Sequence, residues 1–412
     1  MTASVFSRQP KFDTIMTTPS QTPCFSALNV PIHRASTVVF EDTAAFLNRK
    51  SRLFDGFSYG LYGTPTTRSL ERAVAQIEGG TRCIVVPSGL ASITQPTLAL
   101  LSPGDHIIVA DCVYGPTRDH CSNLLQRWGI RVDFMASDSA DIRPLLTDRT
   151  RLVVLESPGS FTMEIQDITA IADQAHAVGA LVLADNTWGF GCTNLFTYGV
   201  DIVSTALSKY ASGHSDVCMG AITVRDEALF RQLKSAVAAM GLGVSSDDAY
   251  LVLRGLGTLD VRLREQSASA LRLSQWLRKQ TCVNAVMNPS DPQDASHDRF
   301  KRYFNSSNGL VSIFTNRQDL GGLASMIDGM HRFRIGASWG GIESLVAISE
   351  LSGVRTASHL GIPQYVVRLH LGLEPYEDLQ ADVEVALQRL CNAPLDEDPA
   401  AKREHHTVAR NL

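Results

Sequence analysis

The feature that most constrains the fold is a series of short apolar segments separated by stretches long enough to form helices. The apolar segments span residues 83–86, 106–110, 151–155, 180–184, 202–206 and 221–224. Strands of a parallel sheet are buried on both faces, so they appear as continuous apolar runs with helices between them. The pattern predicts an α/β fold whose mainly parallel sheet is covered by helices on both faces.

The second half of the chain continues the alternation. A long helical pattern covers about 246–279 and is interrupted near Gly255 and Gly257. Strand-like segments follow at 309–314 and 366–371, with helices near 320–330 and after Pro375. We therefore predict an N-terminal arm at 1–60, a large domain at 61–255, a smaller C-terminal α/β domain at 256–391 and a polar tail at 392–412.

Composition excludes several classes of protein. The 412 residues carry a formal net charge of −5, with 44% hydrophobic and 19% charged residues and no long basic run, so we expect neither nucleic-acid binding nor a membrane span. The N-terminal residues lack the apolar core of a signal peptide. The eight cysteines are scattered without metal-ligand spacing, which predicts buried free thiols and no metal site. These features predict a cytoplasmic protein.

Lys209 is the first candidate for chemistry. It follows the apolar run 202–207 and precedes a loop of small and polar residues. Burial at the end of a strand can lower the pKa of a lysine amine and leave part of it unprotonated. Such an amine can form a Schiff base with a carbonyl cofactor, although a lysine at this spacing is more commonly a solvated side chain.

Other candidates also follow predicted strands, at the sheet edge where open α/β proteins bind ligands. Ser88, Gly89 and Leu90 open a helix, whose free N–H groups can hold a phosphate. Tyr114 can stack on a flat ring, and Asp185 ends the fourth strand. A phosphate site, an aromatic ring, a carboxylate and a lysine are the groups needed to bind pyridoxal 5'-phosphate (PLP).

At these residues the chain resembles the Cys/Met metabolism family of PLP-dependent enzymes, and within it bacterial cystathionine β-lyase. The resemblance covers about residues 20–390. It is carried by the motifs Tyr59-Gly, Ser88-Gly89, Tyr114, Glu156-Ser-Pro-Gly-Ser, Ala184-Asp185-Asn-Thr-Trp, Ser208-Lys209-Tyr, Gly213-His-Ser-Asp, Ser338-Trp-Gly-Gly-Ile-Glu-Ser-Leu and Val367-Arg368-Leu-His. The resemblance implies the aspartate-aminotransferase-like fold of type I PLP enzymes and a homotetramer built from two dimers that share active sites.

The resemblance also implies roles for individual residues. Lys209 would carry the cofactor and move the substrate α-proton, Asp185 would pair with the pyridine nitrogen, and Tyr114 would stack on the ring. The phosphate would be held by Ser88, Gly89, Leu90 and Ser208, together with Tyr59 of the neighbouring subunit. Arg368 would bind the α-carboxylate of an amino acid substrate, with Ser160 and Ser338 nearby. Ser160 and Trp339 favour the β-lyase side of the family.

Two positions depart from the family pattern. An arginine that reaches the cofactor phosphate across the dimer interface usually stands where this chain has Leu61, and losing its charged hydrogen bond would cost about 1.5–3 kcal/mol. The bacterial β-lyase has another arginine where this chain has Tyr62. Asp119 matches the β-lyase pattern and could meet a distal cation. Leu61 and Tyr62 either pack at the subunit interface or shape a pocket for a substrate whose far end is neutral or cationic.

These observations predict a PLP-dependent carbon–sulfur β-lyase that converts a cysteine-type S-conjugate to thiol, pyruvate and ammonia. The alternative on the same scaffold is γ-elimination or γ-replacement, which needs a second proton abstraction at Cβ by Lys209, Tyr114 or Tyr59. A catalytically silent PLP-binding protein ranks lower, because Lys209 and Arg368 are both present. A nicotinamide dehydrogenase lacks support, because no strand is followed by GxGxxG.

Overall fold

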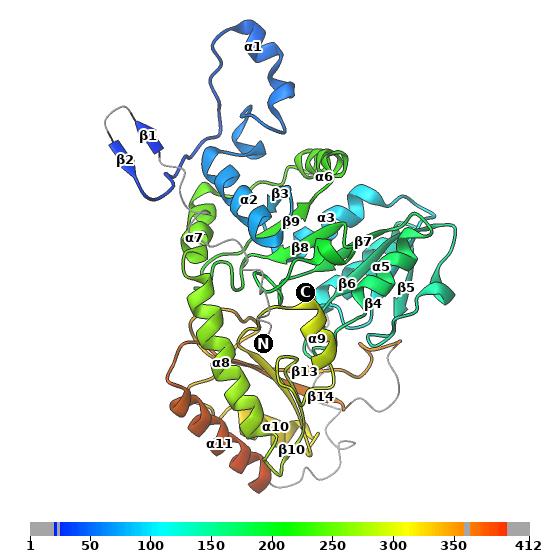
Figure 1. Cartoon of the computed structure of the whole chain (residues 1–412), viewed down its shortest axis with the longest axis vertical. Coiled ribbons are helices and arrows are strands. Elements are labelled where there is room, and N and C mark those ends of the chain that lie inside the picture. The colour runs from blue at the N-terminus through cyan, green and yellow to red at the C-terminus, as the bar shows by residue number, and fades with distance from the viewer. Residues whose placement is uncertain (1–19, 23–24, 358–362, 394–412) are drawn as a thin grey trace, which may run out of the picture.

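A computed structural model describes residues 20–22, 25–357 and 363–393 of the chain. It contains two sheets of unequal size, with the short N-terminal elements projecting from the side of the larger one (Figure 1). Residues 394–412 of the predicted tail and most of the first 24 residues lie outside the described part, whereas Asn392, the first residue of the predicted tail, still belongs to the last helix. The projecting elements are β1 (Ser20–Thr22), β2 (Phe25–Ala27), α1 (Thr43–Leu47) and the 3₁₀ turns η2 (Arg49–Arg52) and η3 (Gly60–Tyr62).

The larger sheet confirms the predicted α/β class. In sheet order its seven strands are β3 (Arg82–Val86), β9 (Gly220–Val224), β8 (Ile202–Ala206), β7 (Leu181–Asp185), β6 (Thr150–Glu156), β4 (His106–Ala110) and β5 (Arg131–Met135). Only β9 runs opposite to its neighbours within this sheet. The carboxyl ends of the other six strands therefore meet at one edge, which brings the predicted site residues together.

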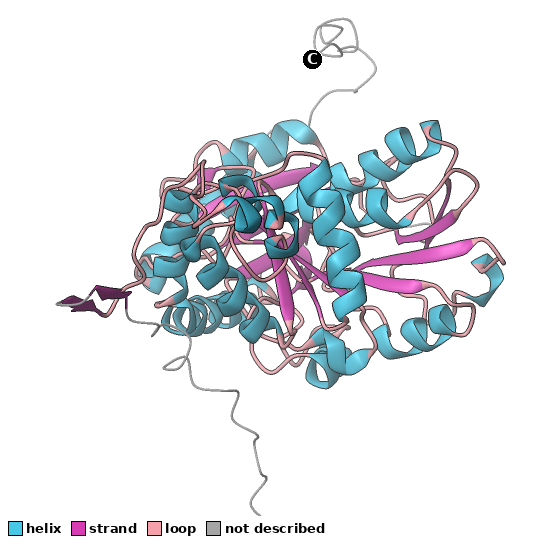
Figure 2. Cartoon of the chain, turned by 90° about the horizontal axis from the view of Figure 1, so that it is seen from above, coloured by secondary structure: helices cyan, strands magenta, loops and turns pink. Residues whose placement is uncertain are grey.

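Helices lie on both sides of this sheet (Figure 2). They are α2 (Pro65–Glu78), α3 (Gly89–Leu100), α4 (Gly115–Asp119), α5 (Ile168–His176), α6 (Glu227–Ala239) and α7 (Ser246–Leu256), with shorter turns η4 (His120–Leu125), η5 (Arg143–Leu145) and η6 (Leu195–Tyr198). Capping residues that can be recognised in the sequence fix the ends of two of these helices. The Asp167 carboxylate accepts the Ala170 N–H at the start of α5, and Gly79 ends α2 at φ 75°.

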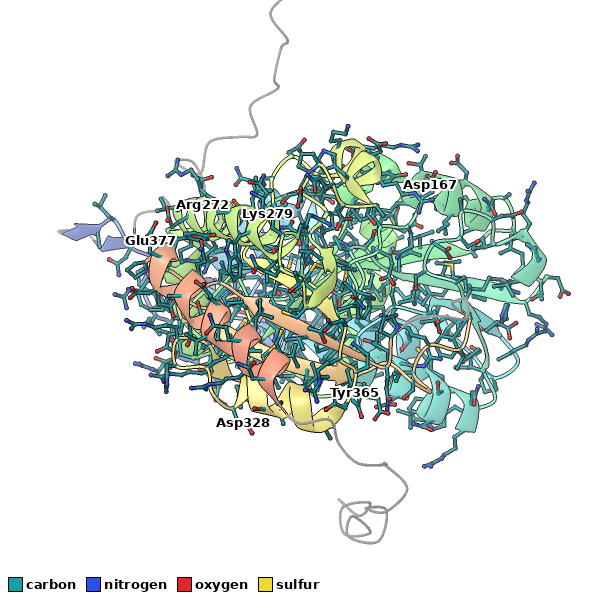
Figure 3. All side chains as sticks on the ribbon, turned by 90° about the horizontal axis from the view of Figure 1, so that it is seen from below. Asp167, Arg272, Lys279, Asp328, Tyr365 and Glu377 are labelled. Carbon is teal, nitrogen blue, oxygen red and sulfur yellow. The ribbon has the colours of Figure 1, made fainter. Side chains whose placement is uncertain are left out.

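The smaller sheet belongs to the C-terminal part of the chain. Its strands, in order, are β10 (Val283–Met287), β11 (Leu310–Thr315), β14 (Tyr365–His370), β13 (Leu345–Glu350) and β12 (Arg334–Ile335). The helices here are α8 (Leu259–Leu277), α9 (His297–Tyr303), α10 (Leu320–Ile327) and α11 (Tyr376–Asn392). The helix predicted to reach residue 330 thus ends at Ile327. Figure 3 shows Arg272 of α8 beside Glu377 of α11, where the two form an ion pair at 3.1 Å.

Each sheet has its own apolar core, and α8 connects the two. Leu259 and Leu263 at the start of α8 pack in the core of the large sheet, whereas Leu273 and Leu277 pack in the core of the small one. The predicted domain boundary at 255/256 falls one residue before the end of α7, and we retain it as a proposal. Buried thiols were expected, and five described cysteines are buried, but the expectation is wrong for Cys218 and Cys391, which are exposed.

Polar contacts join the two parts close to the predicted cofactor lysine. The buried Tyr210 hydroxyl accepts a hydrogen bond of 3.0 Å from the Gly309 N–H at the start of β11. Arg262 of α8 donates to the carbonyl oxygens of Tyr210 and Gly255 at 2.9 and 2.8 Å. Since Tyr210 follows Lys209 directly, these bonds fix the backbone of the lysine relative to the second sheet.

We expect Tyr210→Phe to lower the free energy of unfolding by about 1–3 kcal/mol, because it leaves the buried Gly309 N–H without its acceptor. Denaturant unfolding of the purified variant measures the loss. Tyr198→Phe is the matched control, since its hydroxyl donates to the Arg302 carbonyl at an exposed site where water can replace it. Equal losses in both variants would contradict this role of Tyr210.

Candidate functional site

Lys209 lies in the turn after β8, where its side chain faces the C-terminal part of the chain. Its Nζ donates a hydrogen bond of 2.7 Å to Ser338 Oγ and lies 5.5 Å from the centre of the Trp339 ring. Burial and the nearby Arg368 cation lower the pKa of the amine to about 8. A substantial fraction of Lys209 is therefore neutral near physiological pH, as a nucleophile or base requires.

Asp185 ends β7, the strand next to that of the lysine. Its Oδ1 accepts hydrogen bonds from the Thr187 N–H at 2.9 Å and the Thr187 hydroxyl at 2.5 Å, and burial raises the pKa of the carboxyl. Thr187 Oγ1 also accepts the Ala206 N–H at 2.8 Å. Thr187 thus connects the carboxylate to the end of β8, a role that the sequence did not reveal.

The residues predicted to hold a phosphate lie at the N-terminus of α3 and in the turn after β8. Ser88 Oγ accepts the Ala91 N–H at 3.1 Å, which caps the helix, and the N–H groups of Gly89 and Leu90 belong to its first turn. A Cβ on Gly89 would lie 2.4 Å from the Ala206 Cβ, so only glycine lets the helix start this close to β8. The Ser208 hydroxyl is paired with the backbone of Met219, donating to its oxygen at 3.1 Å and accepting from its nitrogen at 2.9 Å.

Tyr114 is held by a carboxylate to which the sequence gave no role. Its backbone N–H donates to Glu156 Oε2 at 2.6 Å, and its ring remains 47% exposed beyond the end of β4. Glu156 ends β6 and is the register partner of Asp185 on β7. Burial, reinforced by the Asp185 charge, holds the pKa of the Glu156 carboxyl well above its usual range.

Three of the predicted substrate residues, Ser160, Trp339 and Arg368, line a narrow pocket between the two parts of the chain. Its walls include Glu156, Ser160, Phe161, Trp188, Trp339 and Arg368. Arg368 is only 6% exposed, its guanidinium carbon lies 4.3 Å from the centre of the Phe161 ring, and burial lowers its pKa to about 10. The guanidinium remains charged at neutral pH, so it can bind an anion in this pocket.

The backbone around Ser338 lies very close to that of the lysine. Gly340 adopts a φ of 90°, and a Cβ there would lie 2.8 Å from the Tyr210 nitrogen and 3.1 Å from the Lys209 Cα. Glycine is therefore required at this position by both conformation and space. The contact explains how Ser338, which precedes β13, reaches the lysine that follows β8.

Arg355 makes further contacts that the sequence did not predict. Its guanidinium donates to the Asp111 carbonyl oxygen at 2.6 Å, to the Ser160 carbonyl oxygen at 3.0 Å and to the Thr162 hydroxyl at 2.6 Å. The segment after β13 is thereby joined to the turn that carries Ser160. No signal in the sequence distinguishes Arg355 from a surface arginine, because its partners, two carbonyl oxygens and one hydroxyl, are distant along the chain.

Tyr59, Tyr62 and Asp119 are among the predicted residues that do not line this pocket. Tyr59 and Tyr62 line a separate hollow with Phe40 and Arg49 in the projecting N-terminal part, and their ring centres are 6.2 Å apart. Asp119 is the last residue of α4 and is exposed.

Leu61 lies beside these tyrosines and packs within its own chain. A Cβ on Gly243 would be 2.8 Å from Leu61 Cδ1. This contact lies within one chain, so packing at the subunit interface and shaping of the substrate pocket both stay predictions for Leu61.

The described residues fit PLP by the chemistry of their groups: a lysine of lowered pKa, a buried carboxyl, free helix N–H groups beside a required glycine, and a buried arginine. Over 20–22, 25–357 and 363–393, no three His, Cys, Asp or Glu side chains gather as metal ligands would. Nor is any helix in these ranges long and apolar enough to cross a membrane.

Comparison with known proteins identifies the family. The family model of the Cys/Met metabolism PLP-dependent enzymes matches residues 13–388. The chain belongs to this family. It is therefore a PLP-dependent enzyme, which confirms the predicted cofactor and, with relatives that are cystathionine β- and γ-lyases, the predicted lyase class.

Two curated relatives and one solved structure illustrate the similarity. Cystathionine β-lyase MetC of Escherichia coli (strain K12) is 35% identical over 88% of this chain and 94% of that protein. Cystathionine γ-lyase of Dictyostelium discoideum is 33% identical over 82% of this chain and 88% of that protein. The crystal structure of metB from Corynebacterium glutamicum matches with a TM-score of 0.83 and 26% identity, covering 92% of this chain and 98% of that one. This similarity confirms the predicted type I fold.

We expect the apoprotein to acquire PLP at a rate that rises with pH and levels off above a midpoint near 8, because only the neutral Lys209 amine attacks an aldehyde. The absorbance of bound PLP, followed between pH 6 and 10, gives the rate. Lys209→Ala should show no covalent attachment at any pH. A midpoint near the ordinary lysine value would show that burial does not activate the amine.

Proposed function

We propose that this enzyme is a carbon–sulfur β-lyase that cleaves a cysteine-type S-conjugate to a thiol, pyruvate and ammonia. The observation that carries the proposal is the 2.7 Å contact of Lys209 Nζ with Ser338 Oγ beside the buried Arg368. It places a base of lowered pKa next to a cation suited to a carboxylate, the pair needed to remove the α-proton of an amino acid. PLP, when bound, supplies an electron sink for the negative charge that develops at Cα.

Arg368 and the groups around it orient the substrate. Its planar guanidinium can bind the α-carboxylate through two parallel hydrogen bonds, and the low exposure of the pocket strengthens them. Ser160 and Ser338 lie beside the carboxylate in this arrangement, and Trp339 forms a wall of the pocket. A carboxylate fixed in this way presents the α-hydrogen of the substrate to Lys209.

Lys209 then works as a base and returns the proton. Its amine, held by the Ser338 hydroxyl, takes the α-proton, and the ammonium so formed can protonate the departing thiolate sulfur. Water completes the reaction by releasing pyruvate and ammonia. The bond broken is the Cβ–S bond, so the overall change requires no oxidant or reductant.

The remaining predicted residues hold PLP in this proposal. Asp185, oriented by Thr187, pairs with the pyridine nitrogen, and Tyr114, held by Glu156, stacks on the ring. The phosphate is held by the N–H groups of Gly89 and Leu90, at the start of the helix that Ser88 caps. Ser208 and Tyr59 of a neighbouring subunit also contact the phosphate. Asp119 and Tyr62 face the far end of the substrate.

The role proposed for Tyr59 requires a homo-oligomer. The N-terminal part exposes large apolar side chains, including 89% of Val39 and 71% of Leu47, as a segment that packs on another subunit would. We propose the homotetramer implied by the family resemblance, with its active sites shared between subunits, and a cytoplasmic location.

The second candidate is γ-chemistry, which the similarity to a cystathionine γ-lyase favours. It needs proton removal at both Cα and Cβ, whereas β-elimination needs only the first. Exchange of substrate hydrogens in deuterium oxide separates the two: exchange at Cβ supports the γ route, and its absence rejects it.

We expect the PLP-loaded enzyme to release pyruvate and a thiol from cystine and other cysteine S-conjugates. Turnover of cystathionine should be weaker, because Tyr62 stands where the bacterial β-lyase has an arginine for the distal end of cystathionine. A keto-acid and thiol assay over this panel, extended to γ-substituted amino acids, measures the products. Release of 2-oxobutyrate in place of pyruvate would contradict the β-lyase proposal. Rapid turnover of cystathionine would contradict only the proposed substrate preference.

We expect Leu61→Arg to tighten PLP binding about ten- to a hundredfold, because a charged hydrogen bond to phosphate contributes about 1.5–3 kcal/mol. Equilibrium titration of the apoprotein measures the affinity. Leu61→Met is the control, because it changes the packing against Gly243 without adding charge. No tightening in the arginine variant would mean that the site already compensates for the missing cation.

A further inference from the structure

A buried carboxyl lies behind the proposed cofactor site and has no role in the mechanism above. Glu78 is the last residue of α2 and is fully buried. Its Oε1 is 2.5 Å from the Thr205 hydroxyl, and its Oε2 is 2.6 Å from Asn186 Nδ2. Both partners are uncharged, although a buried carboxylate normally has a cation or several donors beside it.

Glu71, two turns earlier on the same helix, shows the contrast. It is also buried, but its carboxylate contacts Arg68 at 2.8 Å and Lys234 at 3.3 Å. The sequence therefore places cations beside one buried glutamate of α2 and uncharged groups beside the other. This difference suggests that the two carboxyls carry different charges in the folded protein.

The surroundings of Glu78 oppose a negative charge. The titratable groups that influence it or respond to it are Asp185 from β7, Cys83 from β3 and Cys192 from the loop after β7, and all of them are acids. The C-terminal end of α2 adds the negative end of a helix dipole. Burial and the Asp185 charge raise the pKa of Glu78 to about 8, against the two hydrogen bonds that lower it.

The hydrogen-bond partners connect Glu78 to the proposed site. Asn186 follows Asp185 directly, and its N–H donates to the Ser204 oxygen on β8 at 2.8 Å. Thr205 lies on β8 four residues before Lys209. The buried Asn186 Oδ1 has no hydrogen-bond partner among the described residues. A protonated Glu78 can donate its hydrogen to Thr205 Oγ1 or, if the Asn186 amide is turned, to that oxygen.

We propose that Glu78 acts as a neutral carboxylic acid that positions Asp185 and the end of β8 through Asn186 and Thr205. Kept neutral, Glu78 orients both strand ends without placing a second negative charge behind Asp185. An ionised Glu78 would repel the Asp185 carboxylate and favour its protonation, which would remove the charge needed opposite the pyridine nitrogen. The inference rests on the proposed function for the role of Asp185, but not for the protonation state of Glu78.

The decisive comparison is between Glu78→Gln and Glu78→Ala, with Glu384→Gln on the exposed face of α11 as the control. Glutamine resembles the neutral acid, so we expect Glu78→Gln to keep the PLP affinity that Glu78→Ala loses about tenfold. Titration of each apoprotein with PLP, followed by the absorbance of the bound cofactor, measures this difference. A glutamine variant that binds PLP as weakly as the alanine variant would overturn the proposal, because the carboxylate charge would then be required.

Thermal unfolding of the apoproteins gives a second measurement that does not depend on the reaction. Because the folded pKa of Glu78 exceeds its unfolded value, the folded state binds the extra proton, and wild-type stability falls as pH rises towards about 8. The melting temperature of Glu78→Gln relative to wild type should therefore increase between pH 6 and 8 and level off above. A pH-independent difference would overturn the neutral acid, whereas failure of the substrate assays alone would overturn only the proposed function.

Discussion

The structure depends on removing one lysine amine from water at the junction of two sheets. Lys209 follows β8 of the large sheet, whereas Arg368 lies on β14 of the small sheet and the hydroxyl partner Ser338 lies in the segment between β12 and β13. Burial and the arginine charge both lower the pKa of the amine, so neither sheet alone creates the reactive group. The Tyr210 hydroxyl and the Arg262 guanidinium maintain this junction through hydrogen bonds with backbone groups.

Much of the fold could be predicted because buried parallel strands leave a clear signal. The runs that became β4 and β7 are apolar at every position but one, and glycines or capping residues mark the adjacent helices. The reversed direction of β9 could not be predicted, since an apolar run carries no information about which way it crosses the sheet. The edge strand β5 was missed because it is half-exposed and mixes polar with apolar residues.

Some residues of the candidate site could likewise be predicted from the sequence, and others could not. Lys209 and Asp185 could be found because each directly follows a recognisable strand, and family resemblance added Arg368. Glu156 and Arg355 could not be assigned roles, because their hydrogen-bond partners are more than forty residues away in the chain. Thr187 was part of a recognised motif, yet its function depends on the Ala206 N–H of the neighbouring strand. Register and loop packing, which determine these contacts, are tertiary properties.

The close approach of Gly340 to the backbone of Lys209 and Tyr210 has a consequence for how such enzymes can change. A side chain at this position would push the whole C-terminal part away from the lysine and carry Ser338 and Trp339 with it. The two parts of the chain therefore cannot diverge independently at this junction. A chimera that combines the halves of two relatives would retain an aligned site only if both parents share this backbone contact.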